Sequence, residues 1–246
     1  MNISEFLLIS SAIIPDRNAL IFEREEITFY SLQQQVNNLA SNLSQKGITT
    51  EDRIAVMDVN CPQLAQIFFA SNQLDAVYVP INFRARAEEL SQMLKACDPK
   101  ILFIGRRYMP LLKDIDLNSD MIVVATDSSD FTKLLEGDGE QSNFPKHDSH
   151  DTSVIMFTAG TTGTPKGIVR DIGGHIVALK WTMKNIYNID EGDIWWSASD
   201  IGWIVGHSYI VYAPLFKGCA TVLFEGKPVG TPDAGAFWKI ISDYKV

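Results

Sequence analysis

Short runs of apolar residues alternate with stretches of helical periodicity through the first half of the chain. The runs Ile-Ala-Val-Met, Ala-Val-Tyr-Val, Ile-Leu-Phe-Ile and Met-Ile-Val-Val contain no alternation of apolar and polar side chains. Strands of this kind are buried on both faces, which is typical of a parallel sheet covered by helices. The pattern predicts strands at residues 19–22, 27–29, 53–58, 76–80, 100–104, 121–126, 153–157 and 168–170.

Between these strands, apolar residues recur at helical spacing. Ser31 is predicted to cap a long helix that Gly47 ends, and Pro62 suits the first turn of a helix running to about residue 74. Further helices are predicted at residues 87–97, 108–115 and 176–187, with a short amphipathic helix near the start of the chain. Residues 243–246 are expected to enter another strand. The elements together predict an α/β fold of largely parallel sheets covered by helices.

A polar connection separates the two parts of this pattern. Residues 136–151 contain two glycines and one proline and are predicted to run over the surface. We therefore expect a first α/β subdomain at 1–150 and the start of a second at 151–246. His147 and His150 lie in this connection, where a metal site is conceivable, but a solvated loop fixes no ligand geometry and the plain surface interpretation is favoured.

Composition and charge narrow the function classes. The 246 residues include 21 Lys and Arg against 30 Asp and Glu, a net charge of −9. A diffuse nucleic-acid binder is disfavoured, because neutralising phosphates requires a basic surface. An anionic ligand would need a local site set against this field. Cys61, Cys97 and Cys219 are odd in number and far apart, which favours buried thiols in a reducing cytoplasm. No apolar run approaches the ~20 residues that span a bilayer.

Residues 158–167 hold the most informative chemistry. They contain four threonines, three glycines and one lysine. Glycines let backbone N–H groups approach an anion, threonine hydroxyls add donors, and Lys166 supplies a point charge. This combination suits a triphosphate. The segment is not a Walker A loop, since Pro165 precedes the lysine and a β-like run follows, and it is not a dinucleotide fingerprint. The alternative is a glycine-threonine turn that only joins two strands.

Residues 157–167, Phe-Thr-Ala-Gly-Thr-Thr-Gly-Thr-Pro-Lys-Gly, resemble the signature loop of the adenylate-forming (AMP-binding) enzymes. Ala159 stands where serine is usual, which removes one hydroxyl. Residues 76–90 are similar to an upstream element of this superfamily. Residues 200–212 and 225–233 resemble the acetyl- and propionyl-CoA synthetase branch, whereas the first half is more similar to the fatty-acid branch.

The resemblance implies a two-step reaction that uses ATP, Mg²⁺ and coenzyme A. A carboxylate attacks the α-phosphate of ATP, and coenzyme A then takes the acyl group from the acyl-adenylate. The residues implied in phosphate binding are Thr158, Gly160, Thr161, Thr162, Gly163, Thr164 and Lys166. Those implied in an acyl or coenzyme A pocket are Trp203, Ile204, Val205, Gly206 and His207. An indole followed by two β-branched residues makes a small, stiff wall that suits a short acyl group, acetate or propionate.

The plainer alternatives concern the same residues. Without the resemblance, residues 203–205 are ordinary core. Residues 206–210 nearly spell the G-x-S-x-G nucleophile elbow, but Ile210 replaces its last glycine, so a serine hydrolase is rejected. His207 is interpreted as orienting substrate or backbone, and no residue is assigned a catalytic role. His175 is expected at a helix start, as a cap or a surface residue.

The extent of the resemblance leaves three hypotheses. The family's later elements, including its C-terminal lid domain, have no counterpart in these residues, so we expect this polypeptide alone to have little ligase activity. The first hypothesis is a short-chain acyl-CoA ligase of the cytoplasm. The second is a medium- or long-chain ligase or another adenylating enzyme. The third is a non-catalytic nucleotide-binding module whose exposed sheet edge favours self-association.

Overall fold

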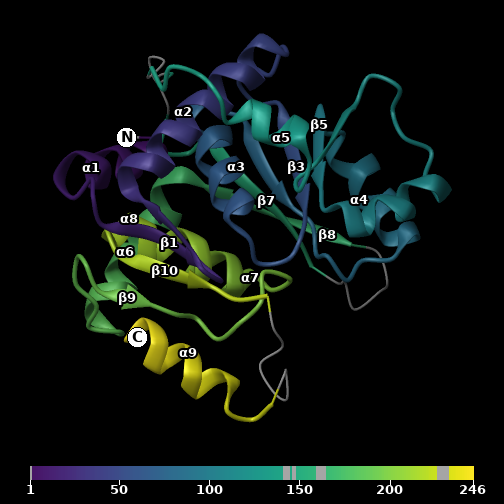
Figure 1. The fold of residues 1–246 in the computed structure, drawn as a ribbon. Coiled ribbons are helices and arrows are strands. Elements are labelled where there is room, and N and C mark those ends of the chain that lie inside the picture. The colour runs from purple at the N-terminus through teal and green to yellow at the C-terminus, as the bar shows by residue number, and fades with distance from the viewer. Residues whose placement is uncertain (1, 141–144, 146–147, 159–164, 226–232) are drawn as a thin grey trace.

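The computed structural model describes residues 2–140, 145, 148–158, 165–225 and 233–246, and arranges them as two sheets with helices packed around them (Figure 1). A four-stranded sheet has the order β2-β1-β10-β9 and a six-stranded sheet the order β6-β5-β3-β4-β7-β8. The first sheet contains β1 Asn18–Phe22, β2 Glu25–Thr28, β9 Ile194–Trp195 and β10 Ala220–Leu223. The second contains β3 Arg53–Met57, β4 Val77–Pro80, β5 Ile101–Ile104, β6 Ile122–Ala125, β7 Thr152–Thr158 and β8 Lys166–Asp171.

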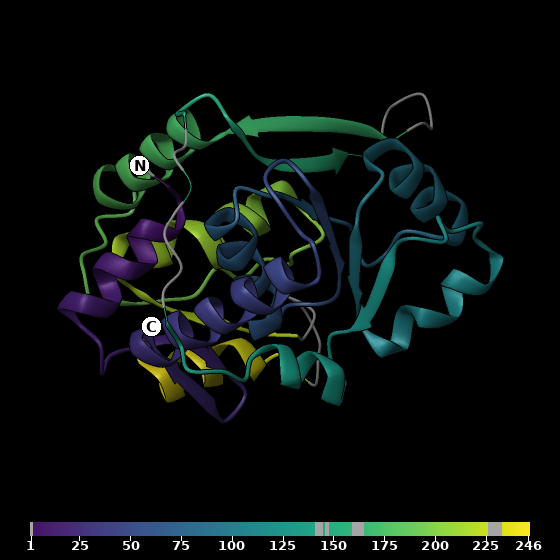
Figure 2. The ribbon, with the colours of Figure 1, turned by 90° about the horizontal axis from the view of Figure 1, so that it is seen from above.

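The prediction of largely parallel sheets is confirmed. Strands β6, β5, β3, β4 and β7 run parallel, and β1, β10 and β9 run parallel in the other sheet. Strands β2 and β8 are antiparallel edge strands. Figure 2 shows the β7–β8 hairpin along one edge of the molecule. Both sheets take strands from either side of residue 150, and the predicted division of the chain there stays a prediction.

Helices cover both faces of the six-stranded sheet. Ile54 and Val56 of β3 face the main core, whereas Ala55 and Met57 face a second cluster with Leu90 of the helix that follows β4. The helices are α1 Ser4–Ile13, α2 Phe29–Gln45, α3 Pro62–Gln73, α4 Ala87–Cys97, α5 Ser129–Leu134, α6 Ile172–Asn185, α7 Ile204–Gly206, α8 Ala213–Lys217 and α9 Ala236–Tyr244. A 3₁₀ helix spans Arg106–Asp114 and a π-helical turn spans His207–Tyr212. Burial on both faces explains the unbroken apolar strands β3, β4 and β5, whereas the edge strand β6 is half-buried.

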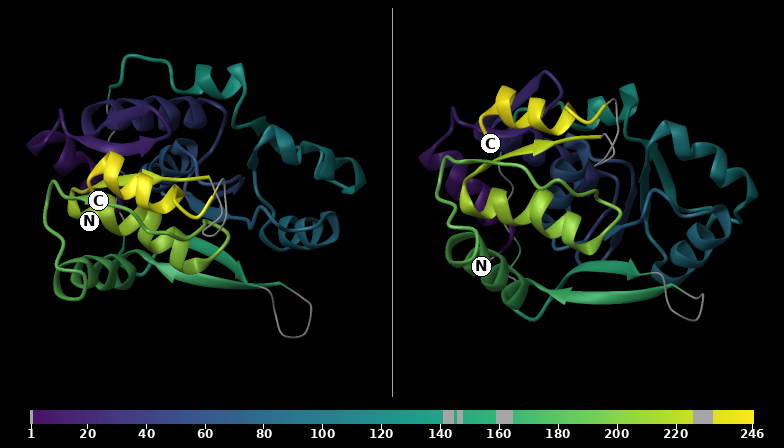
Figure 3. Two further views of the ribbon diagram at one scale, coloured as in Figure 1. Left: turned by 60° about the horizontal axis from the view of Figure 1, so that its bottom comes forward. Right: turned by 90° about the horizontal axis from the view of Figure 1, so that it is seen from below.

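Two predicted local features are wrong. The cap of α2 is Thr28 and not Ser31, because the Thr28 hydroxyl accepts the backbone N–H of Ser31 at 3.1 Å. Residues 243–244 are helical and form no strand, because they end α9, which is drawn in yellow in Figure 3. Ile240 of this helix belongs to one apolar cluster with Ile21 and Val222 of the four-stranded sheet. No helix in the part of the chain that the structure describes has the length and hydrophobicity of a membrane span.

Candidate functional site

The carboxyl ends of the two sheets lie next to each other. Arg107, which follows β5, forms an ion pair with Glu225, which follows β10. Asn60, beyond the end of β3, donates a hydrogen bond to the carbonyl of Phe224 at 2.8 Å. In sheets of parallel strands, ligands bind beyond the carboxyl ends. This shared edge is therefore the candidate site.

The predicted phosphate loop connects the end of β7 to the start of β8 at this edge. Thr158, the last residue of β7, pairs in register with Lys166, the first residue of β8, and Phe157 pairs with Gly167. Lys166 is exposed. The other predicted phosphate ligands, Gly160, Thr161, Thr162, Gly163 and Thr164, lie outside the described residues. The loop therefore joins two antiparallel strands and opens no helix, unlike a Walker A loop.

A small cavity adjoins the two ends of this loop. It has a volume of about 140 Å³ and is lined by Asn82, Arg84, Ala85, Glu89, Met93, Phe157, Thr158 and Pro165. Asn82 and Arg84 follow β4, the strand beside β7 in the sheet. The guanidinium of Arg84 also lies over the Phe83 ring, 4.3 Å from its centroid. The segment after β4 thus lies against Thr158 and Pro165, the described ends of the loop.

The predicted acyl wall divides into an exposed and a buried part. Trp203 and Val205 are 63% and 59% exposed, and Ile204 is half-buried. Gly206 and His207 are buried. The exposed pair argues against the interpretation of residues 203–205 as ordinary core, because exposed large apolar side chains are free to meet a ligand.

Hydrogen bonds from Asn60, which follows β3, hold the segment that leads into this wall. The side-chain oxygen of Asn60 accepts the backbone N–H of Ile201 at 2.9 Å, and its amide donates to the carbonyl of Ser199 at 3.3 Å. Gly206 is required here, since a Cβ on it would lie 2.0 Å from the carbonyl oxygen of Asp200. The wall is therefore fixed from outside its own helix.

His207, the last of the predicted wall residues, is buried. Burial lowers its pKa to about 3, against the opposing effect of a hydrogen bond to the backbone of Ile201. Its ring stacks obliquely on Tyr212, with centroids 6.0 Å apart. The imidazole is therefore neutral at pH 7, in keeping with a role in orienting the backbone.

Asp58 is a buried polar residue at this edge that the sequence reasoning missed. Its carboxylate accepts the Thr126 hydroxyl and the backbone N–H of Val59. Burial raises its pKa, an effect that these two hydrogen bonds only partly oppose. Gly105 leaves room for it, because a Cβ there would lie 2.6 Å from Oδ1. Its position directly after an unbroken apolar strand was the available signal.

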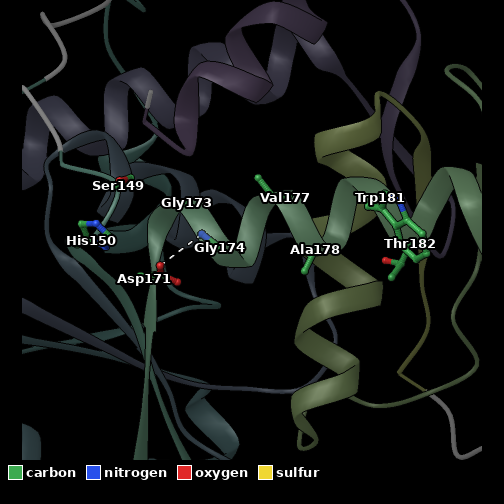
Figure 4. Close-up of a pocket in the computed structure, with 9 residues that line it drawn as sticks. All are labelled: Ser149, His150, Asp171, Gly173, Gly174, Val177, Ala178, Trp181 and Thr182. Carbon is green, nitrogen blue, oxygen red and sulfur yellow. Dashed lines mark hydrogen bonds between the residues drawn. The ribbon is translucent and has the colours of Figure 1, made fainter.

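A second, shallower pocket of about 650 Å³ lies along α6 (Figure 4). Figure 4 shows Asp171, which caps this helix by accepting the backbone N–H of Gly174 at 3.3 Å, and Val177 and Trp181 on its outer side. His175 is buried and its pKa falls to about 4, mainly through desolvation. The prediction of His175 as a cap or surface residue is wrong, because Asp171 caps the helix and the imidazole faces the core ring of Tyr212.

No metal centre is built by the side chains that the structure describes. Among those residues, no three His, Cys, Asp or Glu side chains gather closely enough to hold an ion. His150 lies in the α6 pocket, and His147 is outside the described residues. Mg²⁺ in nucleotide sites is held largely by substrate phosphates and one or two carboxylates. We therefore name no Mg²⁺ ligand among the described residues.

Comparisons with known proteins match nearly the whole length of this chain. The family model described as "AMP-binding enzyme" matches residues 11–246. Acyl-CoA synthetase short-chain family member 3, mitochondrial, of Rattus norvegicus is 34% identical over an alignment covering 94% of this chain and 38% of that protein. Acetyl-coenzyme A synthetase of a Bradyrhizobium strain is 28% identical, with 94% and 40% covered. This chain thus spans about two fifths of the length of these relatives.

Solved structures support the same fold. The crystal structure of an anthranilate CoA ligase in complex with anthranoyl-AMP matches with a TM-score of 0.90 at 20% identity. The match covers 100% of this chain and 47% of that one. At this identity the likeness concerns the fold alone.

Proposed function

The chain belongs to the AMP-binding enzyme family, whose model matches residues 11–246, and on that premise we propose that it forms part of an AMP-forming acyl-CoA synthetase for short-chain carboxylates. The resemblance first noted at residues 157–167 is thereby confirmed at the level of the family. The observation that carries the proposal is the position of Thr158 and Lys166. They are paired across the hairpin at the carboxyl edge of the sheet, and Thr158 lines a small cavity together with Arg84.

ATP binds through its β- and γ-phosphates at the hairpin turn. The ligands are Thr158, Gly160, Thr161, Thr162, Gly163, Thr164 and Lys166. When the carboxylate attacks the α-phosphate, charge develops on the departing pyrophosphate. Preorganised donors stabilise such charge without reorganising, which is the usual source of catalytic electrostatics. Mg²⁺ accompanies ATP and neutralises part of the same charge.

The carboxylate's acyl group meets the exposed wall of Trp203, Ile204 and Val205, with Gly206 and His207 behind it. A large indole beside β-branched side chains leaves little depth, which favours acetate or propionate over longer chains. The names of the rat and Bradyrhizobium relatives, a short-chain acyl-CoA synthetase and an acetyl-coenzyme A synthetase, are consistent with a short-chain substrate. Coenzyme A is the acceptor in the second step.

The state of the cysteines bears on the cellular compartment. Cys61, Cys97 and Cys219 are all free and buried, which suits a reducing compartment such as the cytoplasm. The partners are the small-molecule substrates, and the acidic balance of the chain speaks against nucleic acid.

Replacement of Lys166 tests the phosphate site. Lys166→Ala is expected to weaken ATP binding by about 10- to 100-fold, because it removes a charge-assisted contact of 1.5–3 kcal/mol with a phosphate. Isothermal titration calorimetry with MgATP measures this on the 246-residue chain. Lys113→Ala is the matched control, since Lys113 is also exposed but lies in the 3₁₀ helix. Equal affinity of wild type and Lys166→Ala would remove Lys166 from its role.

The acyl substrate is tested by ATP–pyrophosphate exchange in the longest natural polypeptide that contains this chain. We expect acetate or propionate to support exchange better than butyrate, and octanoate to support it least, because the exposed wall is shallow. Adjacent homologues should differ by about 1–3 kcal/mol in activation free energy, since one methylene contributes no more. Preference for octanoate would favour the longer-chain ligase. Absence of exchange, with light scattering that reveals oligomers, would favour the non-catalytic module.

A further inference from the structure

One ion pair connects the segment after β4 to the segment that begins the acyl wall. Arg84 Nη1 donates to Asp200 Oδ1 at 2.9 Å, and Nη2 donates to Oδ2 at 2.7 Å. The two residues are 116 positions apart in the sequence. The Asp200 side chain is only 17% exposed, and the Arg84 hydrogen bonds hold its pKa below the usual range. Parallel, bidentate bonds of this kind fix orientation as well as distance.

Asp200 passes this restraint to the wall through the backbone. Its Oδ1 also accepts the N–H of Gly202 at 2.9 Å, and its carbonyl accepts the N–H of Trp203 at 3.2 Å. The contacts around Gly202 are tight, because a Cβ there would lie 2.8 Å from Asn82 Oδ1 and 2.9 Å from Arg84 Nη1. The direction in which Trp203 points thus depends on where Arg84 holds Asp200.

Arg84 is also restrained on its other side. Its backbone N–H is accepted by Asn82 Oδ1 at 2.9 Å, and its guanidinium lies over the Phe83 ring. Arg84 lines the small cavity together with Thr158 and Pro165, the described ends of the hairpin turn. One side chain therefore lies between the base of the predicted phosphate loop and the start of the predicted acyl wall.

We propose that Arg84 is a positioning residue that sets the spacing between Thr158 and Pro165, the described ends of the phosphate loop, and the acyl wall by holding Asp200. The proposal rests on the function assigned above to those two segments. The reacting pair, a carboxylate bound beside MgATP, spans both segments and depends on this spacing, whereas ATP alone contacts only the phosphate end. Loss of Arg84 should therefore weaken carboxylate binding selectively.

The selective effect separates positioning from general stabilisation. Arg84 is about half exposed, and exposed ion pairs contribute little to the stability of a fold. A merely structural pair would alter the melting temperature slightly and affect both ligands equally. Arg84→Lys keeps the charge but loses the planar two-point contact, so it should restore the wall position only in part.

The wall position is tested by ¹⁹F NMR on the 246-residue chain labelled with fluorotryptophan, with the Trp203 resonance assigned by Trp203→Phe. In Arg84→Gln and in Asp200→Asn we expect the Trp203 resonance to shift and broaden, while those of Trp181 and Trp238 stay in place. Arg106→Gln is the matched control, because Arg106 follows β5 at the same edge and its pair with Asp127 is 3.9 Å long and exposed. It should move no tryptophan resonance.

The ligand readout uses α,β-methylene-ATP with Mg²⁺, which cannot release pyrophosphate, and propionate titrated in its presence on the same samples. Arg84→Gln should weaken propionate binding about tenfold with the affinity for the ATP analogue unchanged, a loss equal to one charge-assisted hydrogen bond. A Trp203 resonance that coincides with wild type in both Arg84→Gln and Asp200→Asn would overturn the proposal, as would equal weakening of both ligands. Wild-type chain that binds neither ligand would contradict the proposed function, while the fluorine spectra would still decide the position of the wall.

Discussion

Burial determines the protonation state of two histidines, His175 and His207. His175 and His207 are buried and both contact the Tyr212 ring, and burial lowers the pKa of the first to about 4 and of the second to about 3. Arg170 lowers both pKa values further. Sequence predicted neither burial, because histidine occurs equally at helix starts and in cores.

Buried neutral histidines should make the fold sensitive to mild acid. Their folded pKa values lie below the unfolded value of 6.5, so their contribution to the free energy of unfolding is fully present above pH 6.5. It falls as the pH drops toward 4, by on the order of 2 kcal/mol for each histidine at pH 5. Urea denaturation between pH 7 and 4.5 measures this loss.

The control for this acid sensitivity is an exposed histidine. His175→Gln should flatten the pH dependence in that window, whereas His150→Gln should leave it as in wild type, because His150 is exposed. Carboxylates with lowered pKa values, such as Asp52 and Asp200, lose their contribution only below about pH 4. An unchanged slope in His175→Gln would contradict the burial of that imidazole.

Elements are predicted well where periodicity is long and poorly where one polar atom decides. The unbroken apolar strands and helix 87–97 appear where the pattern puts them, because burial on both faces leaves a strong signal. The cap of α2 was misassigned because Thr28 and Ser31 both have N-cap chemistry, three residues apart. Helix α9 was missed although Phe237, Ile240, Ile241 and Tyr244 recur at helical spacing.

Hydroxyl deletion distinguishes the two candidate caps of α2. Thr28→Val keeps the shape of the side chain and removes the acceptor for the Ser31 N–H, so it should destabilise the fold by about 1 kcal/mol. Ser31→Ala removes only the hydrogen bond that the Ser31 hydroxyl accepts from the Thr28 hydroxyl at 3.0 Å, and it should cost less. Thermal unfolding of the two variants measures the difference. A larger loss for Ser31→Ala would restore Ser31 as the cap.

At the scale of the whole molecule, the site comes from pairings that local patterns do not contain. β1 pairs with β10, and β4 with β7, so the two carboxyl edges meet only after distant segments associate. The loop at 158–167 and the wall at 203–207 were predicted as separate motifs because each is continuous in sequence. Their neighbours Asn60, Asp58 and the Arg84–Asp200 pair were not, because each works through a partner at least 68 residues away.

The proposed function depends on binding of the ATP phosphates by the residues that connect β7 and β8. A crystal structure of the chain with MgATP tests this binding. We expect the β- and γ-phosphate oxygens within hydrogen-bonding distance of Thr158, residues 160–164 and Lys166, at the carboxyl edge of the sheet. Phosphates bound elsewhere, with the turn making no contact to them, would contradict it.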